Sequence, residues 1–179
     1  EIVGLSTVAG NVTLGHTTEN TLKICGLMGA GRTELAMSIF GKSYGTNISG
    51  QLYIEGKEVH LNTVQDAIGH KIAYVTEDRK GNGLILSNPI RVNTTLANME
   101  AVSSHGVIDK DKEYMVAVEY KDKLKTKCPG VEQNAGNLSG GNQQKVLLAK
   151  WMFTEPDVLI WMSPQGESTW AQSTRYIVS

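Results

Sequence analysis

The hydrophobic and polar positions along the chain alternate between strand-like and helix-like patterns. Short apolar runs predict strands at 21–27, 72–78 and 154–160, the last two of them buried. The segments "QLYIE" and "KEVHL" alternate on either side of Gly56, which predicts a hairpin. Apolar residues at helical spacing predict helices over 31–41, 63–71, 92–101, 110–124 and 139–153. Strands that alternate with helices indicate an α/β fold with a largely parallel sheet.

Capping and turn residues refine these elements. Thr63 is expected to cap the helix at 63–71, Ser139 is expected to cap the helix at 139–153, and Gly41 is expected to end the helix at 31–41. The glycine-rich stretches at 79–86 and 127–137 are expected to be loops.

Composition and charge narrow the function classes. The chain has 179 residues, 40% hydrophobic and 20% charged, which is typical of a globular domain. Its formal net charge of −1 provides no broad basic face, so we expect no nucleic-acid partner. No run of about 18 apolar residues predicts a membrane span, so any membrane role is expected to come through a partner. Cys25 and Cys128 have no metal-ligand spacing and are expected to be reduced thiols.

A glycine-rich segment, "GLMGAGRT", lies between a predicted strand and a predicted helix. It fits the phosphate-binding pattern G-x-x-x-x-G-K-[ST], except that arginine replaces the usual lysine. Glycines let successive backbone N–H groups turn inward, and the helix directs its positive N-terminus at the same point. The predicted phosphate-binding residues are Gly26, Gly29, Ala30, Gly31, Arg32 and Thr33. The Thr33 hydroxyl is also predicted to bind Mg²⁺.

Two alternatives bear on this segment. One is a glycine-rich turn that binds no ligand. The other is that Arg32 is a surface arginine at a helix start. If it binds phosphate, its guanidinium is wider than an ammonium and binds phosphate as a fork. We expect nucleotide binding to survive this replacement and hydrolysis to be slow or lost.

A second motif, "LSGGNQQK" from Leu138 to Lys145, begins the predicted helix at 139–153. It matches the pattern L-S-G-G-x-Q and is identified as the signature of ATP-binding cassette (ABC) proteins. Together with "GLMGAGRTEL" and "YVTEDRKGNGL", it resembles the second, C-terminal cassette of the tandem ATPases that power bacterial monosaccharide importers, over Leu22 to Ile160. That group also carries arginine in the phosphate loop. A P-loop kinase or GTPase is disfavoured by the signature and by the lack of an N-K-x-D motif.

The resemblance implies a fold and a set of site residues. The fold is α/β, a P-loop NTPase of the ABC type with a small β subdomain and a helical signature subdomain. The implied cofactors are ATP and Mg²⁺. The residues implied to bind the nucleotide held by a second cassette are Ser139, Gly140, Gly141 and Gln143. Glu77, where other cassettes carry glutamine, is implied to bind Mg²⁺ and to form the coupling loop with the permease.

The resemblance also implies a function and a location. The chain would be the ATP-binding subunit, or a fragment of it, of a sugar importer that couples ATP binding and hydrolysis to monosaccharide uptake. Its partners would be a second cassette, a transmembrane permease and a periplasmic sugar receptor. It would lie in the cytoplasm, held to the inner face of the bacterial plasma membrane by the permease. The motifs do not name the sugar.

The catalytic acids of the family are missing from this chain. The family continues "DVLI" with "LDEPTRGIDVGAKYEI", whose Asp holds Mg²⁺ through water and whose Glu polarises the attacking water. Met162 and Ser163 stand at those two positions, so no catalytic residue is intact. This leaves an alternative function open, a non-hydrolysing ATP-binding or interaction module, and whether this chain is itself an enzyme is left undecided.

The segment from 161 to 179 has an unusual relation to the family. One set of codons for the family segment, read one base later, translates as Trp161 to Tyr176. We therefore predict an ABC ATP-binding domain over residues 1–160 and an aberrant tail over residues 161–179 that is an out-of-frame reading. A genuinely divergent tail is the alternative. With either origin, we expect the domain to be incomplete at its C-terminus, with a sheet face left uncovered.

Overall fold

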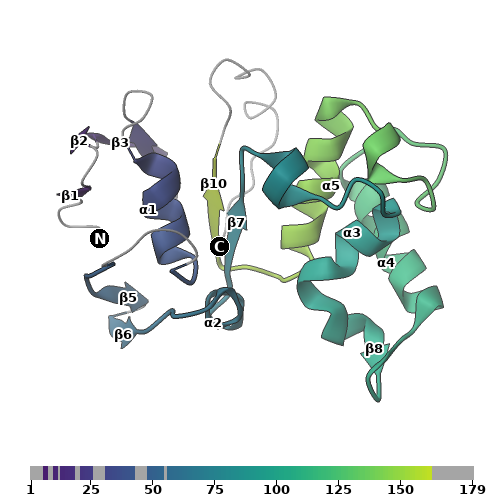
Figure 1. Cartoon of the computed structure of the whole chain (residues 1–179), viewed down its shortest axis with the longest axis horizontal. Coiled ribbons are helices and arrows are strands. Elements are labelled where there is room, and N and C mark those ends of the chain that lie inside the picture. The colour runs from purple at the N-terminus through teal and green to yellow at the C-terminus, as the bar shows by residue number, and fades with distance from the viewer. Residues whose placement is uncertain are drawn as a thin grey trace. The chain divides into compact units, whose positions relative to one another are not determined.

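The computed structural model describes residues 6–7, 10–11, 13–18, 21–25, 31–42, 48–54 and 56–162 of the 179-residue chain (Figure 1). The chain divides into two compact units. One is formed by Glu1–Ile72 with Ser168–Ser179, and the other by Ala73–Glu167.

The first unit is built from antiparallel strand pairs and short helices. Its described elements are β1 (Ser6–Thr7), β2 (Gly10–Asn11), β3 (Thr13–Thr18), β4 (Thr21–Cys25), α1 (Arg32–Ile39), β5 (Leu52–Ile54), β6 (Lys57–Val59) and α2 (Val64–Gly69). β1 pairs with β2, β3 with β4 and β5 with β6, in each case antiparallel. The strand predicted at 21–27 is confirmed as β4, and the hairpin about Gly56 is confirmed as β5 and β6.

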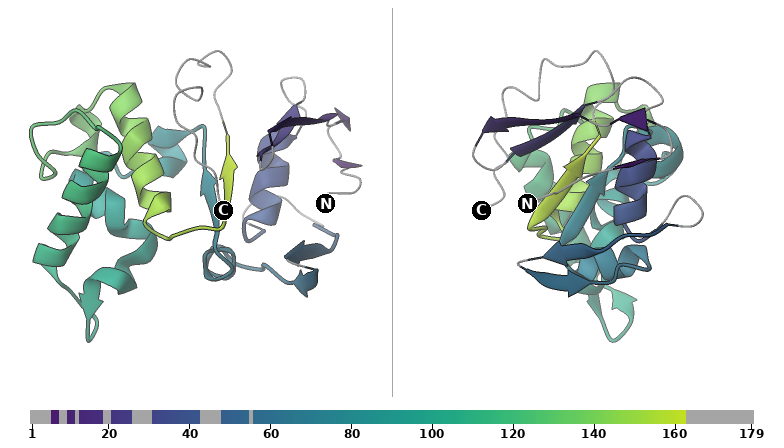
Figure 2. Two further views of the ribbon diagram at one scale, coloured as in Figure 1. Left: turned by 180° about the vertical axis from the view of Figure 1, so that it is seen from behind. Right: turned by 90° about the vertical axis from the view of Figure 1, so that its left-hand side faces the viewer.

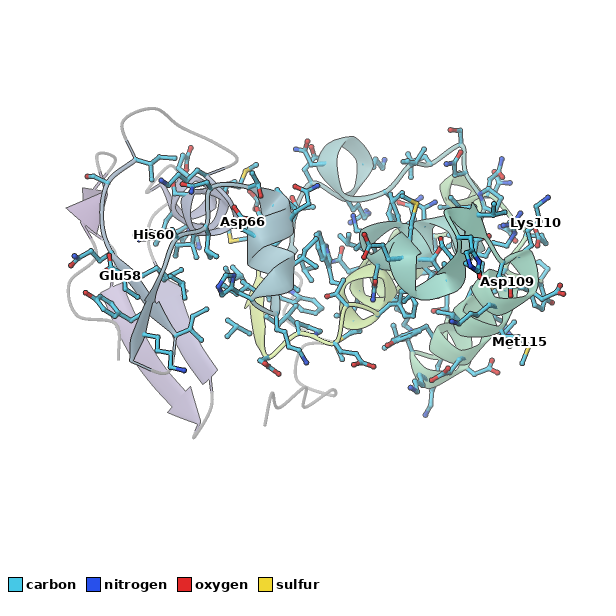
Figure 3. All side chains as sticks on the ribbon, turned by 90° about the horizontal axis from the view of Figure 1, so that it is seen from below. Glu58, His60, Asp66, Asp109, Lys110 and Met115 are labelled. Carbon is cyan, nitrogen blue, oxygen red and sulfur yellow. The ribbon has the colours of Figure 1, made fainter. Side chains whose placement is uncertain are left out.

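The end of α1 and the start of α2 meet at a glycine. Gly41 has a φ of 74°, and a Cβ atom on it would lie 2.2 Å from the backbone carbonyl carbon of Thr63. Glycine alone lacks that atom, so Gly41 ends the helix as the sequence predicts. Thr63 then caps α2: its hydroxyl accepts from the Asp66 N–H at 3.1 Å, and the Asp66 carboxylate accepts from the Thr63 N–H at 2.9 Å. These hydrogen bonds lower the pKa of Asp66, which Figure 3 labels.

The second unit is mainly helical. Its described elements are β7 (Ile72–Val75, whose first residue belongs to the first unit), η1 (Arg79–Gly83), α3 (Ile90–Thr95), η2 (Leu96–Val102), β8 (Ser103–Ser104), β9 (Val107–Ile108), α4 (Lys110–Lys123), η3 (Ala135–Asn137), α5 (Gly140–Met152) and β10 (Val158–Trp161). η1 is a turn of π-helix, whereas η2 and η3 are 3₁₀ helices. β8 and β9 form an antiparallel hairpin. α3 packs against both α4 and α5 (Figure 2).

An apolar core joins these helices. Side chains that are fully buried in it come from α3, η2, α5 and the loop before η3, namely Ile90, Val102, Val131, Val146, Leu147 and Leu148. Burial of such side chains stabilises the fold by roughly 1.5–3 kcal/mol each before the entropic cost is subtracted. Tyr120 of α4 contacts the end of α5, where its hydroxyl donates a hydrogen bond to the Met152 carbonyl oxygen at 3.0 Å.

Charged groups are buried in the same core. Glu113 of α4 is 3% exposed and forms an ion pair with Arg91 of α3. The Arg91 guanidinium also pairs with Glu132 at 2.8 Å, and the hydrogen bond that it donates to the Glu132 carboxylate raises the pKa of Arg91. Thr95 donates to the other Glu113 oxygen at 3.1 Å. The carboxylate of Glu113 is therefore fully partnered although it is buried.

The long charged helix predicted at 110–124 is confirmed as α4. Asp109 caps it, because one of its carboxylate oxygens accepts from the backbone N–H groups of Asp111 and Lys112, both at 3.0 Å. Glu113 and Ala117 are buried, whereas Met115 is 66% exposed, so one face is solvated as predicted. Figure 3 labels Asp109, Lys110 and Met115 at this end of the unit.

Two boundaries predicted from the sequence are wrong. The stretch at 79–86 is not all loop, because the Leu84 N–H bonds the Arg79 carbonyl at 2.8 Å and closes the π-turn η1. The helix predicted at 92–101 begins earlier, at Ile90 after Pro89, and becomes 3₁₀ at Leu96. Proline is favourable at a helix start, where its missing N–H is not needed.

The strand predicted at 154–160 forms as β10, but it is not buried. β10 and β7 are hydrogen-bonded neighbours and run in the same direction in Figure 1. β7 is buried along its whole length, whereas Val158 of β10 is 46% exposed and the rest of β10 is half-buried. Among the described residues β7 is the neighbour that β10 has, so one edge of β10 is left without a strand. The expected largely parallel sheet is likewise not what the described residues show, because the other strand pairs are antiparallel.

Candidate nucleotide-binding site

The predicted phosphate loop lies between β4 and α1. Gly26, Gly29 and Ala30 fall outside the described residues. Gly31 is buried, adopts φ 76° and ψ 21°, and its carbonyl oxygen accepts from the Leu35 N–H at 2.9 Å. Arg32 and Thr33 are half-buried and form the first turn of α1. The order of strand, glycine segment and helix is the one in which a phosphate loop functions.

The signature segment forms the start of α5. Ser139 occupies the N-cap position, is exposed, and precedes Gly140 and Gly141 in the first turn. The predicted serine cap is wrong in one respect: the Ser139 hydroxyl caps no backbone N–H and instead accepts from the Asn142 side-chain amide at 3.0 Å. In the part of the chain that the structure describes, the N–H groups of Gly140, Gly141 and Asn142 donate to no acceptor. These backbone N–H groups are therefore available to an acceptor from outside the described residues.

Side-chain amides fix the shape of this turn. The Oδ1 of Asn142 accepts from the Lys127 N–H at 3.0 Å, while its Nδ2 donates to Ser139. Gln143 is buried, and its Nε2 donates to the carbonyl oxygens of Ala135 at 3.3 Å and Leu138 at 3.2 Å. Gln143 thus points inward and holds the signature turn. Its predicted contact with the nucleotide stays a prediction.

The segment that follows β7 is attached to α5. The Arg79 Nε donates to Gln143 Oε1 at 3.3 Å, and the Lys150 Nζ donates to the Gly83 carbonyl oxygen at 2.6 Å. Leu147 packs on Gly83 between them: its Cδ2 lies 3.1 Å from where a Gly83 Cβ would be. The three residues on α5 are spaced three and four apart, which places them on one face of the helix. Neither Arg79 nor Lys150 could be assigned to the site from the sequence, because their partners lie 64 and 67 residues away along the chain.

Glu77 and Met162 lie near the end of β7. Glu77 is exposed and lies between β7 and η1, and its predicted coupling-loop role stays a prediction. Met162 is half-buried, and its N–H donates to the Val75 carbonyl oxygen at 2.9 Å, so it lies beside the last residue of β7. Ser163 falls outside the described residues.

The described residues of the predicted site are divided between the two units. Glu77, Ser139, Gly140, Gly141, Gln143 and Met162 belong to the second unit, and Gly31, Arg32 and Thr33 to the first. Lys145, the last residue of the signature motif, donates to the Lys125 carbonyl oxygen at 2.8 Å.

No group of three or more His, Cys, Asp or Glu side chains able to hold a metal ion occurs within the described residues. Magnesium in nucleotide sites is usually held by few protein oxygens together with phosphates and water. Thr33 and Glu77, the predicted Mg²⁺ ligands, each carry a side-chain oxygen but belong to different units, so their role stays a prediction. Over the same residues, no helix is long and apolar enough to cross a bilayer.

Comparisons with known proteins identify the family. Residues 9–165 match the family described as ABC transporter. The chain therefore belongs to the ABC transporter family, and the signature assigned from the sequence is confirmed.

The most informative relatives are sugar-import proteins. The chain is 55% identical over 141 residues to the L-arabinose transport ATP-binding protein AraG of Geobacillus stearothermophilus, covering 79% of this chain and 28% of that protein. It is 44% identical over 157 residues to the xylose import ATP-binding protein XylG of Thermoanaerobacter pseudethanolicus, covering 88% and 31%. It is 41% identical over 169 residues to the ribose import ATP-binding protein RbsA of Halalkalibacterium halodurans, covering 94% and 34%. The chain thus spans about a third of the length of these curated relatives.

A solved structure supports the fold. The chain resembles the dimeric post-hydrolysis state of the ATP-binding cassette MJ0796 bound to ADP and Pi, with a TM-score of 0.59 and 16% identity. The match covers 87% of this chain and 72% of that one. At this identity the likeness concerns the fold alone, which is the P-loop ABC fold that the sequence predicts.

Proposed function

We propose that this chain is the ATP-binding part of a bacterial monosaccharide importer. The names of its relatives refer to arabinose, xylose and ribose, so the sugar class rather than one sugar is proposed. Binding of MgATP between this cassette and a second one would be coupled to a membrane permease and a periplasmic sugar receptor. The chain would then act at the cytoplasmic face of the membrane through that permease.

The observation that carries this proposal is the start of α5. Among the described residues its N–H groups at Gly140 and Gly141 have no acceptor, in a turn that Asn142 and Gln143 hold in shape. Exposed amides at the positive end of a helix bind phosphate, and the signature of the family stands at this position. The first turn of α1, with Arg32 and Thr33, supports the same interpretation for the phosphate loop.

Magnesium fits the donors that the chain offers for this function. The Thr33 hydroxyl and the Glu77 carboxylate would hold it, together with phosphate oxygens and water. When bound, it would neutralise charge on the terminal phosphates. The guanidinium of Arg32 would contribute a second, fixed positive charge to those phosphates.

The proposal is tested by nucleotide binding to the full 179-residue chain. Calorimetric titration with MgATP is expected to show saturable binding, and Arg32→Gln is expected to weaken it roughly tenfold or more because a charge-assisted contact is lost. Lys57→Gln removes the same charge from an exposed position on β6 and is the matched control. Absence of binding by the unsubstituted chain, or equal weakening by both variants, would contradict the proposal.

A further inference from the structure

A second arginine lies at the signature turn. Arg79, in η1, approaches Gly140 so closely that a Cβ on that glycine would lie 2.7 Å from Arg79 Nη2. Its Nε is used toward Gln143, at 3.3 Å. The terminal nitrogens Nη1 and Nη2 form no hydrogen bond or ion pair within the part of the chain that the structure describes, and the side chain is half-exposed.

The electrostatics of this arrangement are unfavourable without an anion. The N-terminus of α5 carries a partial positive charge, and a cation placed there is repelled. The guanidinium nevertheless stands beside Gly140, with no carboxylate of the described residues paired to it. A phosphate at the helix start would accept hydrogen bonds both from the amides and from the guanidinium, and would turn the repulsion into attraction.

Arg79 is also held in place. The carbonyl oxygen of Gly83, at the other end of η1, accepts from Lys150 at 2.6 Å, and Leu147 packs on Gly83 between the two polar contacts. Within η1, the Asp78 carboxylate accepts from the Gly81 N–H at 2.9 Å. A guanidinium that is fixed before the ligand arrives loses less entropy on binding than a free side chain does.

We propose that Arg79 is a second phosphate-binding residue of the signature site, where its Nη groups donate to the nucleotide phosphate that α5 receives. This inference rests on the proposed function, because it assumes that the signature binds a nucleotide phosphate. It adds a cation to a site otherwise made of backbone amides and a serine hydroxyl. It also gives η1 a role: the turn carries the arginine to the helix start.

The test uses the full chain labelled with ¹⁵N, and inorganic tripolyphosphate as the probe. The amide signals of Gly140 and Gly141 are followed during titration of the unsubstituted chain and of Arg79→Gln, Arg79→Lys and Lys80→Gln. Lys80 is the next residue in η1, is exposed, and serves as the control for net charge. The dispersion of each spectrum reports whether the variant is folded.

We expect saturable shifts of both amides in the unsubstituted chain. Arg79→Gln is expected to weaken tripolyphosphate binding about tenfold, whereas Arg79→Lys, which keeps the charge, stays within about threefold. Lys80→Gln is expected to bind as the unsubstituted chain does. A role limited to holding Gln143 would weaken Arg79→Gln and Arg79→Lys equally, because both lose the Nε hydrogen bond.

Three outcomes overturn the inference: equal weakening by both Arg79 variants, equal weakening by Lys80→Gln, or no shift of the Gly140 and Gly141 amides. The proposed function is read separately, from the response of the Gly31 and Thr33 amides to MgATP in the same samples. If those amides respond while Arg79→Gln binds tripolyphosphate normally, the inference fails and the proposed function stands. If they do not respond, the proposed function fails.

Discussion

Two arginines of the second unit have opposite surroundings. Arg91 is paired with the carboxylates of Glu113 and Glu132, and Thr95 completes the bonding of Glu113. Arg79 has the neutral amide of Gln143 as its partner and stands at the positive end of α5. The charge of Arg91 is balanced within the protein, whereas the charge of Arg79 is oriented but not balanced.

The difference separates a structural role from a binding role. An ion pair that is satisfied inside the core fixes how α3 and α4 pack and has nothing left for a ligand. A fixed cation without a carboxylate is a feature of anion-binding sites. Predictions that remove one partner at a time therefore test whether the two arginines differ as described.

The largest expected effect comes from Glu113→Ala. It leaves Arg91 with an exposed partner and empties a buried position, so the free energy of unfolding should fall by about 3–5 kcal/mol. Urea unfolding followed by circular dichroism measures it. Glu132→Ala removes the exposed partner instead and should cost at most about 1 kcal/mol. If both variants lost the same free energy of unfolding, the buried Arg91–Glu113 pair would contribute no more to stability than the exposed Arg91–Glu132 pair.

A smaller effect is expected from Lys150, a buried cation that contacts the Gly83 carbonyl oxygen and the Trp151 ring and has no carboxylate partner among the described residues. Burial lowers the pKa of Lys150 to about 8, from 10.5 for an ordinary lysine. Between these two pH values the unfolded chain binds more protons, so stability should rise as the pH increases from 8 to 10.5. The gain should be roughly 3 kcal/mol over that window, and it should be absent in Lys150→Met. Urea midpoints at pH 7.5 and 10.5, compared between the two proteins, measure it. If the difference in urea midpoint between the two proteins were the same at both pH values, the burial of a charged Lys150 would be contradicted.

The smallest effect concerns two neighbouring glutamines that are both buried. Gln143 bonds Arg79, Ala135 and Leu138. The side-chain amide of Gln144 is buried without a hydrogen-bond partner in the described part of the chain. Gln143→Met should therefore lower stability by about 1–2 kcal/mol, whereas Gln144→Met should be neutral or raise it by about 1 kcal/mol. Thermal unfolding midpoints give the order, and the reverse order would be inconsistent with these contacts.

Local patterns predicted much of this molecule. Thr63 with Asp66, the hairpin about Gly56, and the glycine after α1 are features of a few adjacent residues, and all were confirmed. The family followed from the signature because eight consecutive residues specify it. The sequence could not predict that Arg79 of η1 contacts Gln143 of α5, or that Lys150 of α5 contacts Gly83 of η1. Those contacts depend on how distant segments pack.

Other predictions failed for the same reason or stay open. The exposure of β10 depends on its sheet neighbours rather than on its own apolar residues. Ser139 was expected to cap the helix, but the side chain of Asn142 competes for its hydroxyl. Residues 163–179, with Ser163, fall outside the described residues, so the out-of-frame origin of the tail stays a prediction. The DNA sequence across codon 160 tests it.

Because Gly41 has no side chain, the end of α1 can approach the start of α2 closely. Any side chain there would overlap the backbone of Thr63 and Val64, at 2.2–2.4 Å. A lineage could lose this glycine only by rebuilding the connection between the two helices. In a saturation library at position 41 selected for stably folded protein, glycine should consequently be recovered.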